Sequence, residues 1–248
     1  MSEQLIKKEK YKFEDYIRMF AGESFYFVFS DIFLEHYKEL GVLSVQDSKN
    51  WISFLPKNSK QKTLEKGKNL FTNKKLFDRY NKDFYNYMEE SSKYFESILR
   101  KEIIGAEETK IFLDLTSKHF FYTDLIDQEK MAISTSQFGK LKLDGRAYLN
   151  KILFEGNGYL RSFIKKISNQ TNVPESELLS YGVGEIIELV RSKKRIDPDE
   201  IKIRNLYFHS KEDRLFGEDS KELAKKFISR HQKISNEIPN RSKLRGIR

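Results

Sequence analysis

Proline is nearly absent from the middle of this chain, and its absence constrains the fold more than any other feature of the sequence. The four prolines are at positions 56, 174, 198 and 239, so none interrupts the stretch from Lys57 to Val173. Proline breaks helices because it lacks a backbone N–H group and its ring clashes with the preceding turn. This stretch therefore has room for long helices.

Apolar residues recur at helical spacing within the proline-free stretch. Between Asn73 and Ile103 they follow one helical face, at Leu76, Tyr80, Phe84, Met88, Phe95 and Leu99. Similar patterns predict helices over Ala106–Ala132, Gln137–Glu155 and Tyr159–Thr171. Consecutive long helices with short joints favour an antiparallel bundle.

Shorter elements are expected on both sides of these helices. On the N-terminal side, helices are predicted over Lys12–Phe20, Phe25–Leu40, Asp47–Phe54 and Lys60–Phe71, with Ser24 as the N-cap and Gly41 as the stop of the second. On the C-terminal side, helices are predicted over Glu175–Ser180, Glu185–Ser192 and Ser220–Ser229, and Asp197 with Pro198 begins another. Extended segments are predicted at Ile201–Ile203, Leu206–Phe208 and Arg214–Phe216, the last two forming a hairpin across Ser210–Asp213.

These patterns predict a mainly α fold, an antiparallel helical bundle with a small C-terminal β-hairpin. The expected organisation is a bundle over residues 1–172, short helices plus the hairpin packed on it over 173–230, and a basic connector tail over 231–248. Aromatic residues, 20 Phe and 13 Tyr among them, supply enough apolar surface for a folded core.

Composition excludes several classes of site. The chain has no cysteine, so disulfides, cysteine zinc sites and thiol catalysis are ruled out. The charged segment from Met1 to Lys12 lacks the apolar core of a secretory signal, and no apolar run approaches the length of a membrane span. We therefore expect a cytoplasmic protein without a membrane partner.

Motifs for self-contained catalysis are missing. None of the four histidines has a partner at zinc-binding helical spacing. Gly156 and Gly158 begin like a dinucleotide loop, but Arg161 stands where the third glycine would be. We expect no metal, no cofactor and no complete active site, which leaves open whether the chain is part of an enzyme.

Two aromatic clusters are the candidate binding features. One comprises Phe25, Tyr26, Phe27 and Phe29, and the other comprises Phe120, Phe121 and Tyr122, close to His119 on the apolar stripe of its helix. A helix that is aromatic on every face is either sandwiched in a core or lines an apolar pocket. If it lines a pocket, the predicted substrate-binding residues are Phe25, Phe29, His119 and Tyr122.

Net charge leaves a nucleic-acid function as an alternative. The chain carries 46 Lys and Arg against 37 Asp and Glu, a formal charge of +9, but acids are interleaved with lysines almost everywhere. The tail from Arg230 to Arg248 contains six basic residues and one acid, yet no aromatic residue on which a base could stack. We predict a connector there. A helical nucleic-acid-binding protein that uses the tail, or a helical adaptor, is the alternative.

A family resemblance covers much of the chain. It is carried by Gly139, Arg146, Val173–Ile187, Lys193–Lys194 and Ile201–Tyr207, and more loosely by Phe25–Asp31 and Trp51. These segments resemble the helical region of phosphoenolpyruvate synthase-like phosphotransferases, between the ATP-grasp domain and the swivelling phosphohistidine domain. The final residues Leu244–Arg248 resemble the opening of that swivelling domain. We expect Gly139, Arg146 and Arg204 to have structural roles, with Arg146 at a helix interface.

The resemblance implies a role without catalysis. The phosphohistidine motif, Thr-Ser-His flanked by Gly and Ala, is absent, because Lys118 separates Ser117 from His119. The ATP-grasp domain and the pyruvate-binding barrel are absent as well. The implied function is a linker or acceptor-binding domain, as in rifampin phosphotransferase. Its implied partners are the ATP-grasp and phosphohistidine domains or subunits and a small-molecule acceptor.

Overall fold

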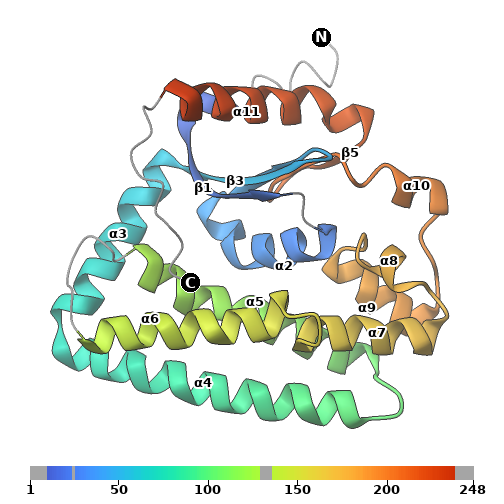
Figure 1. Ribbon diagram of the computed structural model, residues 1–248, viewed down its shortest axis with the longest axis horizontal. Helices are drawn as coiled ribbons and strands as arrows, with labels where there is room; N and C mark the ends of the chain where they lie inside the picture. The colour runs from blue at the N-terminus through green and yellow to red at the C-terminus, as the bar shows by residue number, and fades with distance from the viewer. Residues whose placement is uncertain (1–9, 24–25, 129–135, 238–248) are drawn as a thin grey trace.

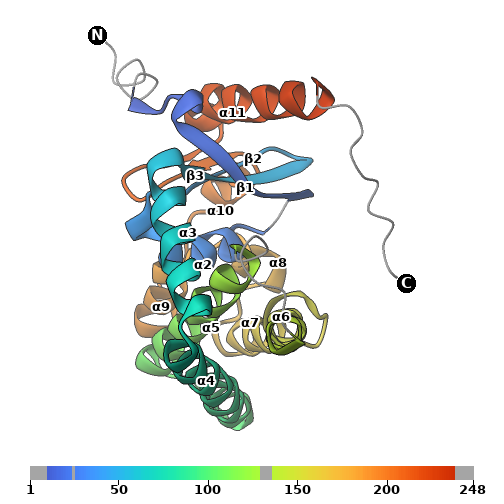
Figure 2. The same ribbon diagram turned by 90° about the vertical axis from the view of Figure 1, so that its left-hand side faces the viewer.

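The computed structural model describes residues 10–23, 26–128 and 136–237, and in it a small β-sheet lies between a helix on one face and a layered set of helices on the other (Figure 1). Helix α11 (Glu218–Glu237) covers one face of the sheet, and α2 (Phe27–Tyr37) lies against the opposite face. Figure 2 shows the same order from the side, with α4 farthest from α11. The described part of the chain is mostly helical.

The helical layer confirms the helices predicted for the proline-free stretch, and residues 129–132 of the helix predicted over Ala106–Ala132 lie outside the described part of the chain. Its members are α3 (Lys57–Thr72), α4 (Lys74–Arg100), α5 (Ala106–Gln128), α6 (Ser136–Leu149) and α7 (Tyr159–Thr171). The side chain of Asn73 caps α4 by accepting a hydrogen bond from the N–H of Leu76. A π-helical turn over Asn150–Phe154 continues α6, so the helix predicted over Gln137–Glu155 ends in π-helical rather than α-helical form.

The sheet is larger than predicted. Its strands are β1 (Tyr16–Glu23), β2 (Leu43–Gln46), β3 (Asn50–Pro56), β4 (Tyr207–His209) and β5 (Arg214–Phe216). Their order in space is β1-β3-β2-β4-β5, and all neighbours are antiparallel. The predicted C-terminal hairpin, β4 and β5, is confirmed, but it forms only one edge of the sheet.

Two predicted N-terminal helices are wrong. Residues expected in a helix over Lys12–Phe20 form the short 3-10 helix η1 (Phe13–Asp15) followed by β1, and those expected over Asp47–Phe54 lie largely in β3. Strand β3 is buried on both faces, so its apolar run does not alternate with polar residues as a half-exposed strand does.

The predicted second helix is confirmed. Helix α2 and the 3-10 turn η2 (Lys38–Leu40) end at Gly41, which has the positive φ of 70° that favours glycine. Ser24 and Phe25 lie outside the described residues. Residues Phe27 to Leu34 are all buried, because α2 is sandwiched between the sheet and the helical layer. This burial explains an aromatic run that occupies every face of a helix.

The C-terminal third follows the predictions with one exception. Short helices occur at α8 (Glu175–Leu178), α9 (Val183–Ser192) and α10 (Pro198–Lys202). Asp197 caps α10 by accepting a hydrogen bond from the N–H of Asp199, as predicted. The extended conformation predicted for Ile201–Ile203 is wrong, because α10 continues through Lys202.

The two expected domains, residues 1–172 and 173–230, contact each other directly. Strand β4 pairs with β2, so that Ser44 lies opposite His209 in one continuous sheet. The N–H of Val28 also donates to the carbonyl oxygen of Leu179 at 3.1 Å. Residues 231–237 of the expected tail extend α11, and residues 238–248 lie outside the described part of the chain.

The sheet separates two apolar clusters. The smaller one lies under α11, where Phe54 and Phe208 of the sheet pack against Phe227. The larger one contains α2 and the helical layer. Among the described residues, no helix combines the length and the apolar character that a membrane span requires.

Candidate functional site

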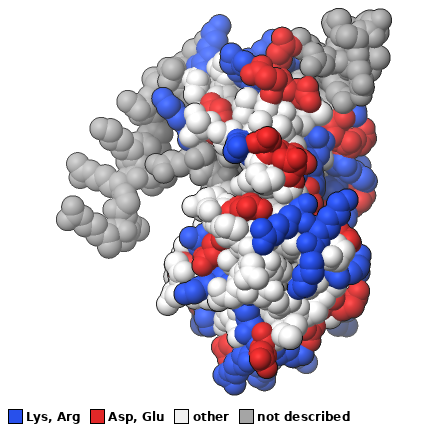
Figure 3. Space-filling view, turned by 90° about the vertical axis from the view of Figure 1, so that its right-hand side faces the viewer, with Lys and Arg blue, Asp and Glu red and all other residues white. Residues whose placement is uncertain are grey.

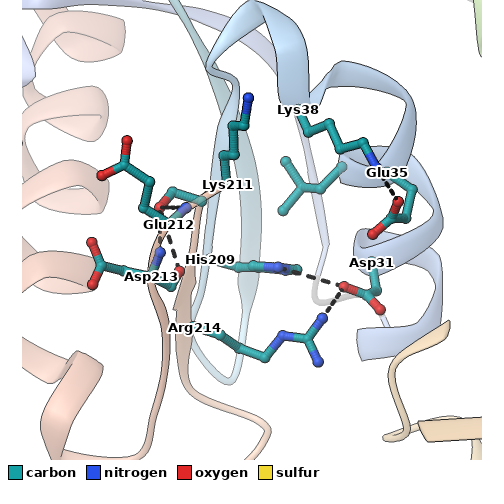
Figure 4. A pocket seen from close by; sticks show the side chains of 10 residues that line it. Asp31, Glu35, Lys38, His209, Lys211, Glu212, Asp213 and Arg214 are labelled. Carbon is teal, nitrogen blue, oxygen red and sulfur yellow. Dashed lines mark hydrogen bonds and ion pairs between the residues drawn. The ribbon is translucent and has the colours of Figure 1, made fainter. Parts of the chain in front are cut away.

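A cavity of about 150 Å³ lies between α2 and the β4–β5 hairpin (Figure 4). Its walls are almost entirely polar, with Leu34 the apolar exception. The lining residues are Asp31, Leu34, Glu35 and Lys38 on the α2 side, and His209, Ser210, Lys211, Glu212, Asp213 and Arg214 on the hairpin side. Charged side chains from opposite ends of the chain therefore meet at this cavity.

Asp31 is the buried anion of the site. It is 1% exposed, and it accepts hydrogen bonds from Arg214 Nη2 at 2.7 Å and from the N–H of Val183 at 2.6 Å. Burial raises the pKa of the Asp31 carboxyl, while Arg214 and the Val183 N–H group oppose that rise. Because both carboxylate oxygens accept hydrogen bonds, we assign Asp31 as the ionised partner of Arg214 at neutral pH.

A second ion pair, between Arg204 and Glu185, lies next to the first. Arg204, which is 2% exposed, donates to both carboxylate oxygens of Glu185 at 2.6 and 2.9 Å. It also donates to Glu200 at 2.5 Å and to the carbonyl oxygen of Ser180 at 3.0 Å. Burial tends to raise the pKa of Glu185, but Arg204 and the Gly182 N–H group lower it overall. The predicted structural role of Arg204 is thus consistent with its burial and its partners.

Gly182 fills the narrow space between the two ion pairs. A Cβ atom on this residue would lie 2.7 Å from Asp31 Oδ2 and 2.9 Å from Arg214 Nη1. Its N–H group donates to Glu185 Oε2 at 2.6 Å. Close approach of charged side-chain ends, rather than an unusual φ angle, therefore favours glycine here.

His209 extends from β4 toward Asp31 (Figure 4). Its Nε2 lies 3.5 Å from Asp31 Oδ1, and its ring centroid lies 5.5 Å from that of Phe27. Burial, assisted by the positive charge of Arg214, lowers the pKa of His209 to about 3. The imidazole is therefore neutral at physiological pH.

Ion pairs also surround the mouth of the cavity. They are Lys38 with Glu35 at 2.9 Å, Lys211 with Glu39 at 3.1 Å, and Lys10 with Glu212 and with Asp213, both at 2.7 Å. Tyr11 holds the hairpin turn from the other side, because its hydroxyl donates to Asp213 Oδ2 at 2.6 Å and lies 2.8 Å from Ser210 Oγ. Each acid that lines the cavity consequently has a basic partner.

The predicted substrate-binding residues lie elsewhere, in the core. Phe29 is 8%, His119 0% and Tyr122 6% exposed, and Phe25 lies outside the described residues. The ring of Tyr87 contacts both His119 and Tyr122, whereas Phe29 stacks on Phe154. Their burial fits the core interpretation of the aromatic clusters, and their role in binding stays a prediction.

Tyr122 is the member of this set that borders open space. It lines two grooves beside α5, of about 540 and 460 Å³, together with Lys118. His119 does not line either groove; its Nε2 lies 3.0 Å from the carbonyl oxygen of Gly145. Burial lowers the pKa of His119 to about 4, so this imidazole is neutral at physiological pH.

Arg146 and Gly139 also carry the family resemblance, but their surroundings differ from those of Arg204. Arg146 is exposed on α6, and its predicted position in a helix interface stays a prediction. A Cβ atom on Gly139 would meet no other atom within 4 Å, so packing does not require glycine there.

The sequence analysis did not identify Asp31, His209 or Arg214 as a group. Asp31 stands in an apolar run of α2, and an acid within the buried part of a helix is the local signal that could have singled it out. Nothing in the spacing connects it with Arg214, which is 183 positions away.

Among the described residues, no group of three or more His, Cys, Asp or Glu side chains has the arrangement of a metal site. Comparisons with protein-family models, curated proteins and solved structures give no match to this chain.

Proposed function

We propose that this chain is a non-catalytic helical middle domain of a phosphoenolpyruvate synthase-like phosphotransferase, which binds an acceptor or links the catalytic domains. The observation that supports this most is the cluster around Arg204. In it Arg204 hydrogen-bonds both Ser180 and Glu185, and all three residues carry the family resemblance. Gly182, from the same stretch, hydrogen-bonds Glu185 within this cluster.

Under this proposal, partner domains carry out the phosphoryl transfer. An ATP-grasp domain binds ATP, a phosphohistidine domain carries the phosphoryl group, and this chain positions the acceptor or the two domains.

An exposed basic patch lies at the end of α9 and consists of Arg191, Lys193, Lys194 and Arg195. Figure 3, which views the side of the molecule where α9 and α10 lie, shows Lys and Arg side chains gathered on part of this face. Such a patch suits an acidic partner surface.

Radiolabelled ATP and phosphoenolpyruvate test the absence of catalysis. Incubated with either compound, the purified chain should acquire no stable label. Acid-labile label on the chain alone would indicate a phosphohistidine and would overturn the proposal.

Binding to isolated partner domains tests whether the chain associates with the catalytic domains. We expect the chain to bind a purified ATP-grasp or phosphohistidine domain of a phosphoenolpyruvate synthase-like enzyme, with a dissociation constant of about 1–100 μM, as in transient domain contacts. The double substitution Lys193→Glu and Lys194→Glu should weaken that binding, whereas Lys74→Glu and Lys75→Glu, a matched exposed pair at the start of α4, should not. Absence of binding to both domains would contradict the proposal.

Nucleic-acid binding is the alternative that the same patch allows. Submicromolar affinity for an oligonucleotide at about 150 mM salt, where surface charges are largely screened, would favour it.

A further inference from the structure

Helix α3 is an exception to the interleaving of acids with lysines in this chain. Residues 57–75 comprise α3 and the start of α4, and they contain seven Lys, no Arg and a single acid, Glu65. This short segment therefore contributes +6 to the net charge of +9. The five lysines within α3, called the α3 lysines below, are Lys57, Lys60, Lys62, Lys66 and Lys68.

The α3 lysines are exposed, and none of them forms an ion pair with an acid of the described residues. On other helices a lysine often has an acid within one turn, as Lys93 has Glu89. The acid of α3, Glu65, instead accepts a hydrogen bond from the uncharged amide of Gln61. The positive charge of α3 is therefore left uncompensated at the surface.

The other side of α3 packs against the protein, so the lysines lie along the side of the molecule that faces the viewer in Figure 2. Thr63 and Gly67 are buried. Lys57 and Lys68 are about 16 Å apart along the helix axis, at a rise of about 1.5 Å per residue. One strand of a nucleic-acid duplex carries about five phosphates over that length.

Composition decides which kind of polyanion this surface fits. A helix that binds an anionic membrane inserts a free apolar face, but none of the large apolar side chains in residues 57–75 is exposed. Protein interfaces are enriched in aromatic residues and Arg and depleted in Lys, which is the reverse of this surface. Phosphate contacts, in contrast, need only positive charge and hydrogen-bond donors, and lysine supplies both.

The surface of α3 also favours a duplex over a single strand. Single strands are held by bases that stack on aromatic rings, and base edges are read most often by arginine. Helix α3 has no arginine and no exposed aromatic residue. Phe121 is exposed beside it, but the ammonium group of Lys66 lies over that ring, 5.1 Å from the centroid.

We propose that the α3 lysines bind the phosphate backbone of a nucleic-acid duplex without reading its sequence. The exposed amides of Asn58, Gln61 and Asn69 lie among the lysines and supply further hydrogen-bond donors to phosphate oxygens. The inference goes beyond the proposed function, because it involves neither an acceptor nor a partner domain. Its surface also differs from the basic patch at the end of α9 and from the C-terminal tail.

Fluorescence anisotropy of a short labelled duplex with the full chain tests this proposal. We expect a dissociation constant of about 1–100 μM near physiological salt, the range of non-specific binding. With about four phosphates contacted, log K should fall with log salt at a slope of about −4. A slope near zero would overturn the proposal. Equal or tighter binding of the single strand, of poly-glutamate or of phosphatidylserine vesicles would overturn it as well.

Two variants of equal charge separate α3 from the net charge. One carries Lys57→Gln, Lys60→Gln, Lys62→Gln and Lys68→Gln, and the control carries Lys110→Gln, Lys193→Gln, Lys194→Gln and Lys225→Gln, all at exposed positions. The α3 variant should bind at least about tenfold more weakly and lose most of its salt dependence, since each phosphate contact contributes about one to the slope. The control should bind within about threefold of wild type, because its α3 is intact.

Glutamine has nearly the helix propensity of lysine, so both variants should fold. Equal losses in the two variants would show that net charge alone attracts the duplex, and a larger loss in the control would move the site to the α9 patch. Either result would overturn the proposal. The comparison of probes on the wild-type chain decides the question even if the α3 variant does not fold.

Discussion

The helical layer and the hairpin region are held together by different kinds of interaction. In the helical layer, aromatic rings stack on one another, as Phe112 does on Phe163 with centroids 4.2 Å apart. In the hairpin region, paired charges such as Asp31 with Arg214 and Glu185 with Arg204 connect α2, α9 and the sheet. Apolar packing depends mainly on volume, whereas a buried ion pair depends on the identity and geometry of both partners. The two regions should therefore tolerate substitution differently.

Truncation in the helical layer should have the largest effect. Phe112 is 0% exposed, and Phe112→Ala should lower the free energy of unfolding by about 4 kcal/mol through the cavity it leaves. Phe112→Leu, which keeps most of the volume, should cost less than half as much. Urea denaturation measures both. Equal losses for the two variants would contradict the view that volume determines stability here.

Arg204→Ala should be nearly as severe, at about 3 kcal/mol, because it leaves the half-buried Glu185 without its bidentate partner. Arg204→Lys should recover little of this loss, since an ammonium group cannot reproduce the two parallel hydrogen bonds that the planar guanidinium donates to a carboxylate. Arg191→Ala, which removes an exposed pair with Glu188, is the control and should cost less than about 1 kcal/mol. A lysine variant as stable as wild type would contradict the geometric requirement.

Gly182→Ala should destabilise the protein by about 2 kcal/mol, because its Cβ atom would approach both Asp31 and Arg214 too closely. Gly184→Ala, two positions later, is the matched control. A Cβ atom there meets nothing within 4 Å, so alanine should leave stability unchanged or raise it by about 1 kcal/mol through its higher helix propensity. The melting temperature should therefore fall for Gly182→Ala and not for Gly184→Ala, and equal shifts would show that the ion pairs leave room for a methyl group.

His119 is a polar exception in the apolar layer, and it should make stability depend on pH. Burial lowers its pKa to about 4, so between about pH 6.5 and 4 the unfolded chain binds a proton that the folded chain does not. Stability then falls as the pH falls through this window, by roughly 2 kcal/mol between pH 7 and pH 5 from this group. His119→Gln should remove that part of the dependence. An unchanged pH profile would mean that His119 is accessible to protons in the folded state.

The helices could be predicted because their signal is local. The apolar stripe that predicts α4 and the stop at Gly41 are visible within short windows. The structure confirms the helix and the stop, although Leu76, the first residue of the stripe, is exposed. Strands β1 and β3 were not recognised, since β3 is covered on both faces and reads as a plain apolar run.

The candidate site could not be predicted, because it has no local signal. Its central pair joins Asp31 to a residue 183 positions away, and only folding brings them together. Glu185 and Arg204 were noticed through the family resemblance, but the resemblance does not specify which residues they contact. The aromatic residues that did stand out, Phe29, His119 and Tyr122, are unusual in sequence because they build the core.

The most direct test of this account is a double-mutant cycle on Asp31 and Arg214, using Asp31→Asn and Arg214→Gln and measuring the free energy of unfolding of all four proteins. If these residues form the ion pair that connects α2 to the C-terminal hairpin, the two losses should overlap. The coupling should then lie within about 0.5–3 kcal/mol, the range for residues in direct contact or in one salt-bridge network. Additive losses, with a coupling below about 0.5 kcal/mol, would contradict the account, because distant and independent sites behave in that way.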